Sequence, residues 1–198
     1  DMMLVCRRNG VKLAVGHQRR FLPSYNMAKK MIADGDIGDA KWVISYARDG
    51  LPNYASHQAD MFRYLLSDPA CTWVMGNVER ETDQWARAIP IEDKALAVFG
   101  FENGAQAMIV SGLTPEHGWR ARVYGSDGMI DVGLTDMKIM NGKTGGWQEH
   151  YPDGEYFKHG DHRFEMLEGG AAQAYEIADW VTGAIPDCRG NATHGYQA

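Results

Sequence analysis

The chain has 198 residues, 44% of them hydrophobic and 23% charged, and its formal net charge is −6. This length allows one sizeable core, or one domain with an appendage. The acidic balance, without a long basic run, argues against a nucleic-acid or anionic-membrane surface, and no apolar run of 18 or more residues occurs. We therefore expect no nucleic-acid partner and no membrane partner.

Both ends of the sequence indicate elements that continue beyond the chain. The first residues predict the last turns of a helix that stops at Asn9-Gly10, and residues 11–17 (VKLAVGH) predict a strand. The closing stretch GNATHGYQA is typical of the first turn of a helix. Basic residues follow the first apolar ones, which argues against a signal peptide. These patterns predict that the chain is a fragment.

The three cysteines lie far apart in the sequence. Cys6, Cys71 and Cys188 form no CxxC pair. This argues against a zinc ribbon or a disulfide scaffold and favours a reducing compartment. We therefore expect a cytoplasmic protein with buried or incidental thiols.

The first half predicts helices and strands in alternation. Pro23 suits a first helical turn with Ser24 as capping residue, and Gly35 and Gly38 stop that helix. Residues 40–48 (AKWVISYAR) predict a strand, 56–68 (SHQADMFRYLLSD) a helix and 72–80 (TWVMGNVER) another strand.

The second half predicts hairpins followed by one long helix. β-like runs flank the turns at Asn103-Gly104, Asp127-Gly128 and Asn141-Gly142. Residues 163–185 then predict a helix. This order predicts the α+β class, with an open, mostly antiparallel sheet and helices packed on one face.

Aromatic residues along the predicted strands provide material for a second sheet face. If that face stays apolar, a partner must cover it, and we expect a homo-oligomer through the sheet face. The alternative is that the aromatic residues fill the helix-facing core, because alternation does not reveal which face is which. The residues concerned are Trp42, Tyr46, Trp73, Phe99, Phe101, Trp119 and Tyr124.

Common catalytic and phosphate-binding motifs are absent from the sequence. There is no GxGxxG, no GxxxxGK[ST], no GxSxG and no HExxH. The stretch HGDHRFE offers four potential metal ligands: His159, Asp161, His162 and Glu165. A loop HxxH without a second pair is a weak metal signal, and we expect no metal site.

The stretch NYASHQAD, residues 53–60, leaves two interpretations open. Asn53 and His57 are four residues apart and share one face if the turn is helical. A neutral imidazole can take a proton from a substrate hydroxyl. The alternative is a helix N-terminus, with Ser56 as N-cap and with His57 and Asp60 satisfying exposed N–H groups.

Longer stretches follow a family pattern. VKLAVGHQRRFLPSYNMAKKMIADGDIGDAKWVISY, HQADMFRYLLSD, VFGFENGAQAMIVSG and RVYGSDGMIDV occur in that order from Lys12 to Asp131. Together they resemble the Gfo/Idh/MocA oxidoreductases, which include glucose–fructose oxidoreductase, inositol dehydrogenase and many sugar dehydrogenases. The last helix fits the pattern more loosely.

The resemblance implies a domain organisation and a chemistry. Residues 1–16 resemble the tail of a Rossmann domain whose dinucleotide loop and Glu-Lys-Pro motif are missing here. Residues 17–198 resemble the substrate-binding and dimerisation domain, whose fold is like the C-terminal domain of dihydrodipicolinate reductase. The implied reaction is hydride transfer between a sugar or polyol carbon and NAD or NADP, which the absent domain would bind.

The resemblance also implies roles for four residues. His57 matches the catalytic His of the inositol dehydrogenase type, and Asn53 stands where that type has an Asp. Arg19 matches a position near the substrate, with an interdomain ion pair as the alternative, and His117 falls near a pocket Tyr. Asp60 matches the Asp that follows in the helix, where a structural role is expected.

The departure at Asn53 keeps a second function class open. An amide can hold a substrate hydroxyl, but it does not stabilise an imidazolium as a carboxylate does. The alternative to a dehydrogenase fragment is therefore a non-catalytic binding or assembly module of the same fold. A glycoside-processing member is disfavoured, because the Gly-His-rich motif of that branch is missing.

Overall fold

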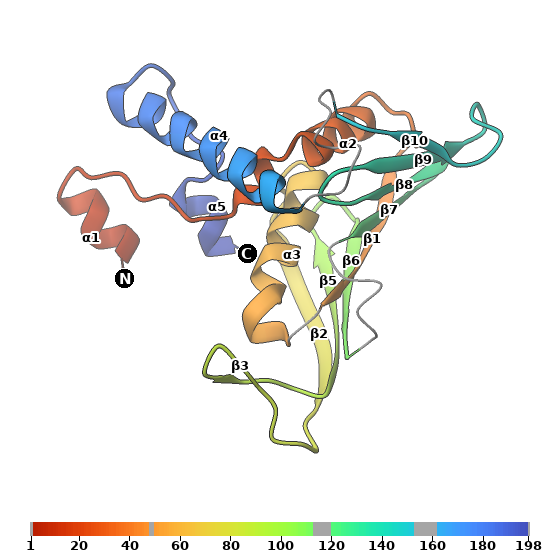
Figure 1. Cartoon of the computed structure of the whole chain (residues 1–198), viewed down its shortest axis with the longest axis horizontal. Coiled ribbons are helices and arrows are strands. Elements are labelled where there is room, and N and C mark those ends of the chain that lie inside the picture. Colours follow the sequence, from red (N-terminus) through yellow and green to blue (C-terminus); the bar gives the residue numbers. More distant parts are fainter. Residues whose placement is uncertain (1, 48–49, 113–119, 153–161, 198) are drawn as a thin grey trace.

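The computed structural model describes residues 2–47, 50–112, 120–152 and 162–197, which form helices packed against a large sheet (Figure 1). Among these residues, no helix is both long and apolar enough to cross a bilayer. The helices are α1 (Met2–Arg8), the 3-10 turn η1 (Gln18–Phe21), α2 (Pro23–Ala33), α3 (Leu51–Leu65), α4 (His162–Thr182) and α5 (Ala192–Gln197).

Eight strands form one open sheet in the order β10-β9-β8-β7-β1-β6-β5-β2. Only the central pair β1 and β6 runs parallel, and the other neighbouring pairs of this sheet are antiparallel. The predicted α+β class with a mostly antiparallel sheet is thus confirmed. The strands are β1 (Ala40–Ala47), β2 (Cys71–Glu79), β5 (Lys94–Phe101), β6 (Gln106–Ser111), β7 (Ala121–Gly125), β8 (Gly128–Val132), β9 (Met137–Asn141) and β10 (Gln148–His150), and a separate ribbon holds β3 (Trp85–Ala86) and β4 (Ile89–Pro90).

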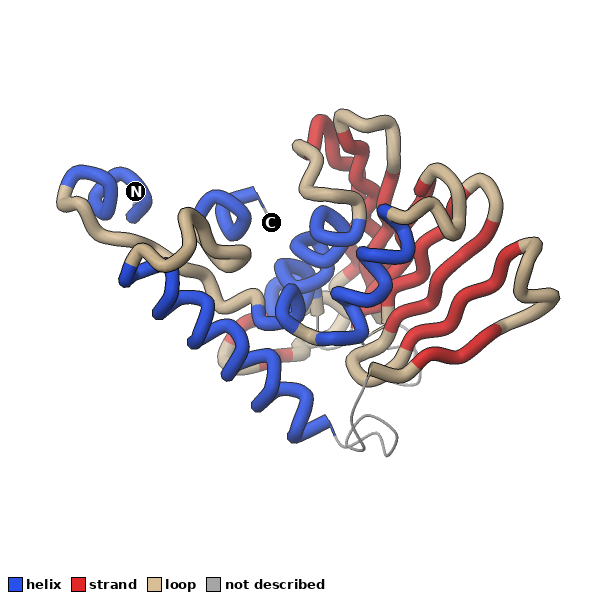
Figure 2. Tube along the Cα trace, turned by 90° about the horizontal axis from the view of Figure 1, so that it is seen from above, coloured by secondary structure: helices blue, strands red, loops and turns tan. Residues whose placement is uncertain are grey.

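The core lies between this sheet and helices α2 and α3, which pack on one of its faces (Figure 2). Val43 pairs with Ala107 on one side and Val123 on the other, so the three side chains form a row across the sheet. All three are fully buried, as is Phe62 of α3. The alternating apolar residues of the strands therefore face the apolar stripes of the helices, as expected for this class.

The opposite face of the sheet keeps apolar side chains exposed. Trp42, Trp73, Met75 and Leu96 are 37%, 44%, 64% and 41% exposed. On β1 Trp42 alternates with the core residue Val43, whereas β2, which carries Trp73 and Met75, is exposed on both of its faces.

The aromatic residues singled out from the sequence divide between the two faces. Phe101 is buried in the core and Phe99 packs against it. Trp42 and Trp73 lie on the exposed face, whereas Trp119 lies outside the described residues. The set is thus divided between the helix-facing core and the exposed face of the sheet.

Two local predictions are wrong. Residues 11–17 form no strand, because their only ladder contact is a single bridge from Ala14 to Asn191, and a strand needs a neighbouring strand. Ser24 caps nothing: Leu22 is the N-cap of α2, and the buried Ser24 hydroxyl lies 2.8 Å from the carbonyls of Gly133 and Leu134. That hydroxyl instead ties α2 to the β8–β9 connection.

Candidate functional site

Helix α3 begins at a carboxylate rather than at a serine. Gly50 is its N-cap residue, and the backbone N–H of Leu51 donates to Oε1 of Glu92 at 2.7 Å. The same oxygen accepts the Ser111 hydroxyl at 2.8 Å. Glu92 thus fixes the first turn of α3 to the sheet, and it satisfies an N–H that would otherwise lack a partner.

The capping interpretation of NYASHQAD is therefore wrong. The helix starts five residues before Ser56, which is exposed. Asp60 lies well inside the helix and is completely buried. The sequence signal for the earlier start is Pro52 directly after Gly50-Leu51, since proline is favoured in a first helical turn.

Asn53 and His57 lie one helical turn apart on α3. Both are half-buried, and their i, i+4 spacing places them on the same face of the helix. Nδ1 of His57 is buried without a hydrogen-bond partner among the described residues. Buried polar atoms usually have a hydrogen-bond partner, so this atom is a candidate for a hydrogen bond that forms when the site is occupied.

The His57 imidazole is held in its neutral form. Burial is the largest cause that lowers its pKa, to about 4, and the positive charge of Arg19 is the next. Arg87, in the turn between β3 and β4, adds to this effect, and Asp60 opposes it. At pH 7 the ring therefore carries a free lone pair, which is the form that a general base needs.

A second imidazole lies against the first. The rings of His17 and His57 are edge-to-face, with centroids 5.6 Å apart and planes at 64°. Nδ1 of His17 is 3.2 Å from Oδ1 of Asp60, and both residues are buried. The sequence analysis did not identify His17, because it lies forty residues before His57 and no periodic pattern links the two.

Asp60 is a structural anchor. Nε of Arg20 donates to both of its carboxylate oxygens at 2.9 Å. Burial alone would raise the pKa of Asp60, but hydrogen bonds from His17 and Arg20 bring it below its ordinary value. Arg20 also binds Asp68 at 2.7 and 3.1 Å, so one guanidinium joins η1 to α3 and to the connection that follows α3.

Arg19 lies close to this group. It is only 4% exposed, and burial lowers its pKa while the neighbouring Tyr25, Tyr54 and Asp60 oppose that effect. Its charge in turn depresses the pKa of His57. Arg19, His17, His57 and Asp60 thus form one electrostatically coupled cluster, to which the i, i+4 spacing adds Asn53.

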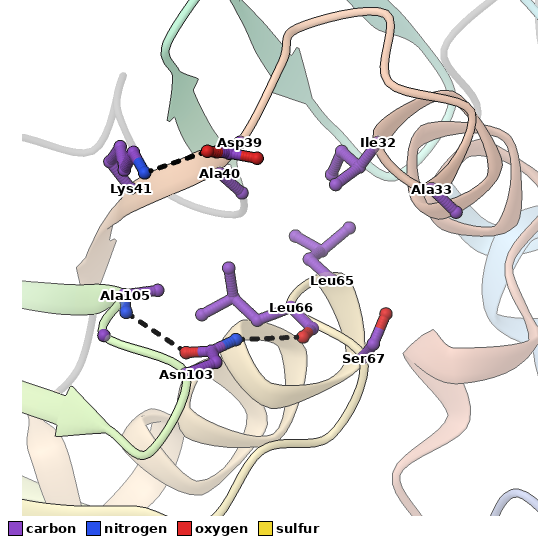
Figure 3. A pocket seen from close by; sticks show the side chains of 11 residues that line it. Ile32, Ala33, Asp39, Ala40, Lys41, Leu65, Leu66, Ser67, Asn103 and Ala105 are labelled. Carbon is purple, nitrogen blue, oxygen red and sulfur yellow. Dashed lines mark hydrogen bonds and ion pairs between the residues drawn. The ribbon is translucent and has the colours of Figure 1, made fainter.

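Figure 3 shows a different hollow, of about 470 Å³, at the other end of α3. It is lined by Leu65 and Leu66, and its polar side chains other than Ser67 have partners. Asn103 donates to the carbonyl of Leu66 and accepts from the N–H of Ala105, and Asp39 pairs with Lys41. Among the described residues, no His, Cys or Glu lines this hollow to act with the Ser67 hydroxyl, so we place the candidate site at the start of α3.

Two further sequence predictions lie mostly outside the described residues. His117, His159 and Asp161 belong to segments that the structure does not describe, and only the backbone of His162 and Glu165 is placed, in α4. In the described part of the chain, no three His, Cys, Asp or Glu side chains come close enough to hold a metal ion.

Comparison with known proteins decides the family. The model of the GFO/IDH/MocA C-terminal domain matches residues 25–131, which contain the whole of α3. The chain belongs to the GFO/IDH/MocA family. The family resemblance inferred from the sequence is thereby confirmed.

Two curated relatives of this family member are named as a dehydrogenase and as an oxidoreductase. Scyllo-inositol 2-dehydrogenase (NAD(+)) of Bacillus subtilis (strain 168) is 30% identical over 143 residues, which are 64% of this chain and 42% of that protein. An uncharacterised oxidoreductase of the same organism, YrbE, is 26% identical over 144 residues. The match thus spans less than half the length of either relative.

Solved structures of the family share the fold. An inositol dehydrogenase homolog from Azotobacter vinelandii, complexed with NADH and myo-inositol, superposes with a TM-score of 0.77 at 17% identity, over 98% of this chain and 61% of the other. An oxidoreductase from Agrobacterium radiobacter, in complex with NAD+, L-tartaric acid and magnesium, gives 0.75 at 16% identity, over 99% and 62%. At these identities the likeness establishes the fold alone.

The residues at the start of α3 have acid–base and hydrogen-bonding chemistry. A neutral, half-buried imidazole next to an amide can accept a hydroxyl proton and orient a polar substrate. The sequence contains no glycine-rich phosphate cradle, and we assign none of the described residues to dinucleotide binding.

Proposed function

We propose that residues 17–198 are the substrate-binding and oligomerisation domain of an NAD(P)-dependent dehydrogenase acting on a sugar or polyol. Residues 1–16 are the end of its nucleotide-binding domain. Support for the boundary comes from α1, whose apolar Met2, Leu4 and Val5 stay exposed, as expected for a helix that packs on a further domain.

The neutral state of His57 carries this proposal. Its pKa of about 4 leaves a free nitrogen lone pair at neutral pH, next to Asn53 on the same helix face. In the proposed reaction Nε2 of His57 takes the proton of the substrate hydroxyl. Asn53 orients a neighbouring hydroxyl of the substrate. Arg19 contributes a positive charge that favours the developing alkoxide.

The oxidised nicotinamide of NAD or NADP supplies the hydride acceptor when it is bound. The named relatives support this assignment, since one is described as NAD(+)-dependent and one structure contains NADH with myo-inositol. The group that discriminates NAD from NADP lies near the ribose 2′-OH, in the dinucleotide-binding domain.

The exposed sheet face supports an oligomer. Trp42, Trp73, Met75 and Leu96 lie on one surface of neighbouring strands, where a second copy would remove them from water. We propose a homo-oligomer that pairs this face with its equivalent.

Asn53 supports the alternative of a non-catalytic binding or assembly module. With an amide in place of the carboxylate, position 53 supplies no counter-charge to His57. Such a module would keep the fold and the oligomer interface without turnover.

The deciding experiment uses the complete protein. Its upstream sequence is expected to contain a GxGxxG motif and a Glu-Lys-Pro motif, and the protein is expected to reduce NAD+ or NADP+ with members of a sugar and polyol panel. His57→Ala should lower kcat at least about a hundredfold. His150→Ala, on β10 at the sheet edge, is the matched control and should keep wild-type turnover. Missing upstream motifs, together with no turnover on any member of the panel, would support the module instead. A His57→Ala variant with full activity would show that His57 is not the base.

A further inference from the structure

In the described part of the chain, the buried Nδ1 of His57 lacks a hydrogen-bond partner, and a neighbouring residue can supply one. Among the described residues it makes no hydrogen bond, although it is buried. Asn53, the residue one turn before it on the same face, is neutral and cannot act as a counter-charge. The imidazole of His17, which lies edge-to-face against His57, has a ring nitrogen that can accept this hydrogen bond.

His17 is held in one orientation by a buried carboxylate. Oδ1 of Asp60 is 3.2 Å from its Nδ1, and Arg20 holds Asp60 through both carboxylate oxygens. In a neutral imidazole, a carboxylate at Nδ1 selects the tautomer with its hydrogen on that atom. Nε2 of His17 then carries the lone pair and can only accept a hydrogen bond.

The distance between the rings fits such a bond. Two imidazoles joined by one N–H···N hydrogen bond have centroids within about 0.5 Å of the 5.6 Å that separates His17 from His57. Hydrogen bonds in catalytic sites are often poorly aligned before substrate binds and tighten afterwards. A small rotation of the half-buried His57 would align the pair.

We propose that His17 is a positioning residue that replaces the missing carboxylate of the site. Its Nε2 accepts the Nδ1–H of His57, and its Nδ1–H donates to Asp60, so a chain Asp60–His17–His57 supports the base where Asn53 does not. This inference rests on the proposed dehydrogenase function and deepens it.

The chain of hydrogen bonds defines where each proton goes. The substrate hydroxyl transfers its proton to Nε2 of His57, and the carbon passes its hydrogen with two electrons to the oxidised nicotinamide. His57 becomes an imidazolium, and Asp60 stabilises that charge through His17. His17 itself keeps both of its hydrogen bonds and no net proton.

A double-mutant cycle in the complete protein tests this proposal. The probe is whichever of myo-inositol, scyllo-inositol or glucose gives the highest turnover with NAD+. His17→Phe should lower kcat about tenfold to a hundredfold and change KM less than about threefold. His17→Gln, whose amide can both donate to Asp60 and accept from His57, should recover most of that loss.

The second substitution of the cycle tests whether a carboxylate at position 53 makes kcat less dependent on His17. Asn53→Asp should raise kcat several-fold more in the His17→Phe background than in the wild-type background. If the two effects simply multiply, or if His17→Phe alters only the melting temperature, the proposal is overturned. His194→Phe is the matched control, since His194 lies 3.4 Å from Asp68 but not against His57, and it should leave kcat unchanged.

A second measurement does not depend on turnover. Nitrogen-15 chemical shifts of the histidines in the complete protein at pH 7 report which ring nitrogen carries the hydrogen. We expect the Nδ1–H tautomer for both His17 and His57, and a change at His57 in His17→Phe. An Nε2–H tautomer of His57 overturns the inference. A protein with these tautomers but no turnover on any substrate would instead count against the proposed function alone.

Discussion

Arg20 and Asp60 are joined across forty residues of sequence by a buried ion pair. The guanidinium Nε donates to both carboxylate oxygens at 2.9 Å, and Nη2 lies 2.7 Å from Oδ1. Neither residue is more than 1% exposed. Because His17 lies three residues before Arg20 and His57 three before Asp60, this pair sets how the two imidazoles meet.

Removal of one partner from this pair should be strongly destabilising. Asp60→Ala leaves the Arg20 charge buried with only Asp68 to balance it, so we expect a loss of about 3–5 kcal/mol in the free energy of unfolding. Urea denaturation of the complete protein measures this. Lys30→Ala, which breaks the exposed ion pair with Asp34, should leave the stability unchanged within error. Equal effects of the two substitutions would contradict a special role for the buried pair.

The pH dependence of stability should reveal the neutral state of His57. Its pKa falls from 6.5 to about 4 on folding, so between these values the unfolded chain binds a proton that the folded chain does not. Stability therefore decreases as the pH falls from 6.5 to 4 and gains nothing further from this group above 6.5. Arg19, His17 and Arg87 face the ring and depress its pKa, and Asp60 opposes them.

His57→Gln should flatten this part of the profile. Urea denaturation at pH 6.5, 5.5 and 4.5 gives the slope for each variant. His194→Gln should also reduce the slope of stability against pH below 6.5, because burial, followed by the charge of Arg20, lowers the pKa of His194. An unchanged slope in His57→Gln would mean that the imidazole is hydrated and protonates normally.

Gly50 should tolerate no side chain at the start of α3. It has φ +80°, and an added Cβ would lie 2.5 Å from Cβ of Ile91. Gly35 has nearly the same φ, +82°, but open space around it. Gly35→Ala should therefore cost about 1–2 kcal/mol from backbone strain alone. Gly50→Ala should cost about 1–3 kcal/mol more, because Ile91 must also move.

Thermal and urea unfolding of both glycine variants test this difference. Gly50→Ala should also lower kcat, since the turn that carries Asn53 starts at Gly50. Gly35 follows the end of α2, far from that turn. Gly35→Ala should therefore leave kcat near the wild-type value. Equal losses of stability in the two variants would show that the Ile91 contact relaxes freely.

The exposed face of the sheet should form the interface between the copies of the oligomer. Met75→Lys places a charge in the proposed interface, on a side chain that is 64% exposed in the single chain. We expect sedimentation velocity to show a smaller species than the wild type at the same concentration. Val181→Lys on α4 changes a side chain of similar exposure, 61%, and should leave the assembly unchanged. A Met75→Lys variant of wild-type size would place the interface elsewhere.

The sequence predicted the elements of the sheet better than the ends of the helices. The Asn-Gly and Asp-Gly turns at 103–104, 127–128 and 141–142 lie in the connections between the predicted pairs of strands, because such turns are specified locally. The start of α3 was misplaced at Ser56, because its first N–H is capped by Glu92, a residue 41 positions away. A cap that comes from elsewhere in the fold leaves no capping residue in the local sequence, so only Pro52 marked this start.

By itself, the sequence determined the fold class, the family and the pairing of Asn53 with His57, since all three depend on local spacing and residue order. Only the tertiary structure decided that His57 is neutral and that His17 lies against it. Both depend on burial and on Arg20 binding Asp60, which bring η1 and α3 together. Desolvation and contacts between distant residues arise when the chain packs, so no linear pattern records them.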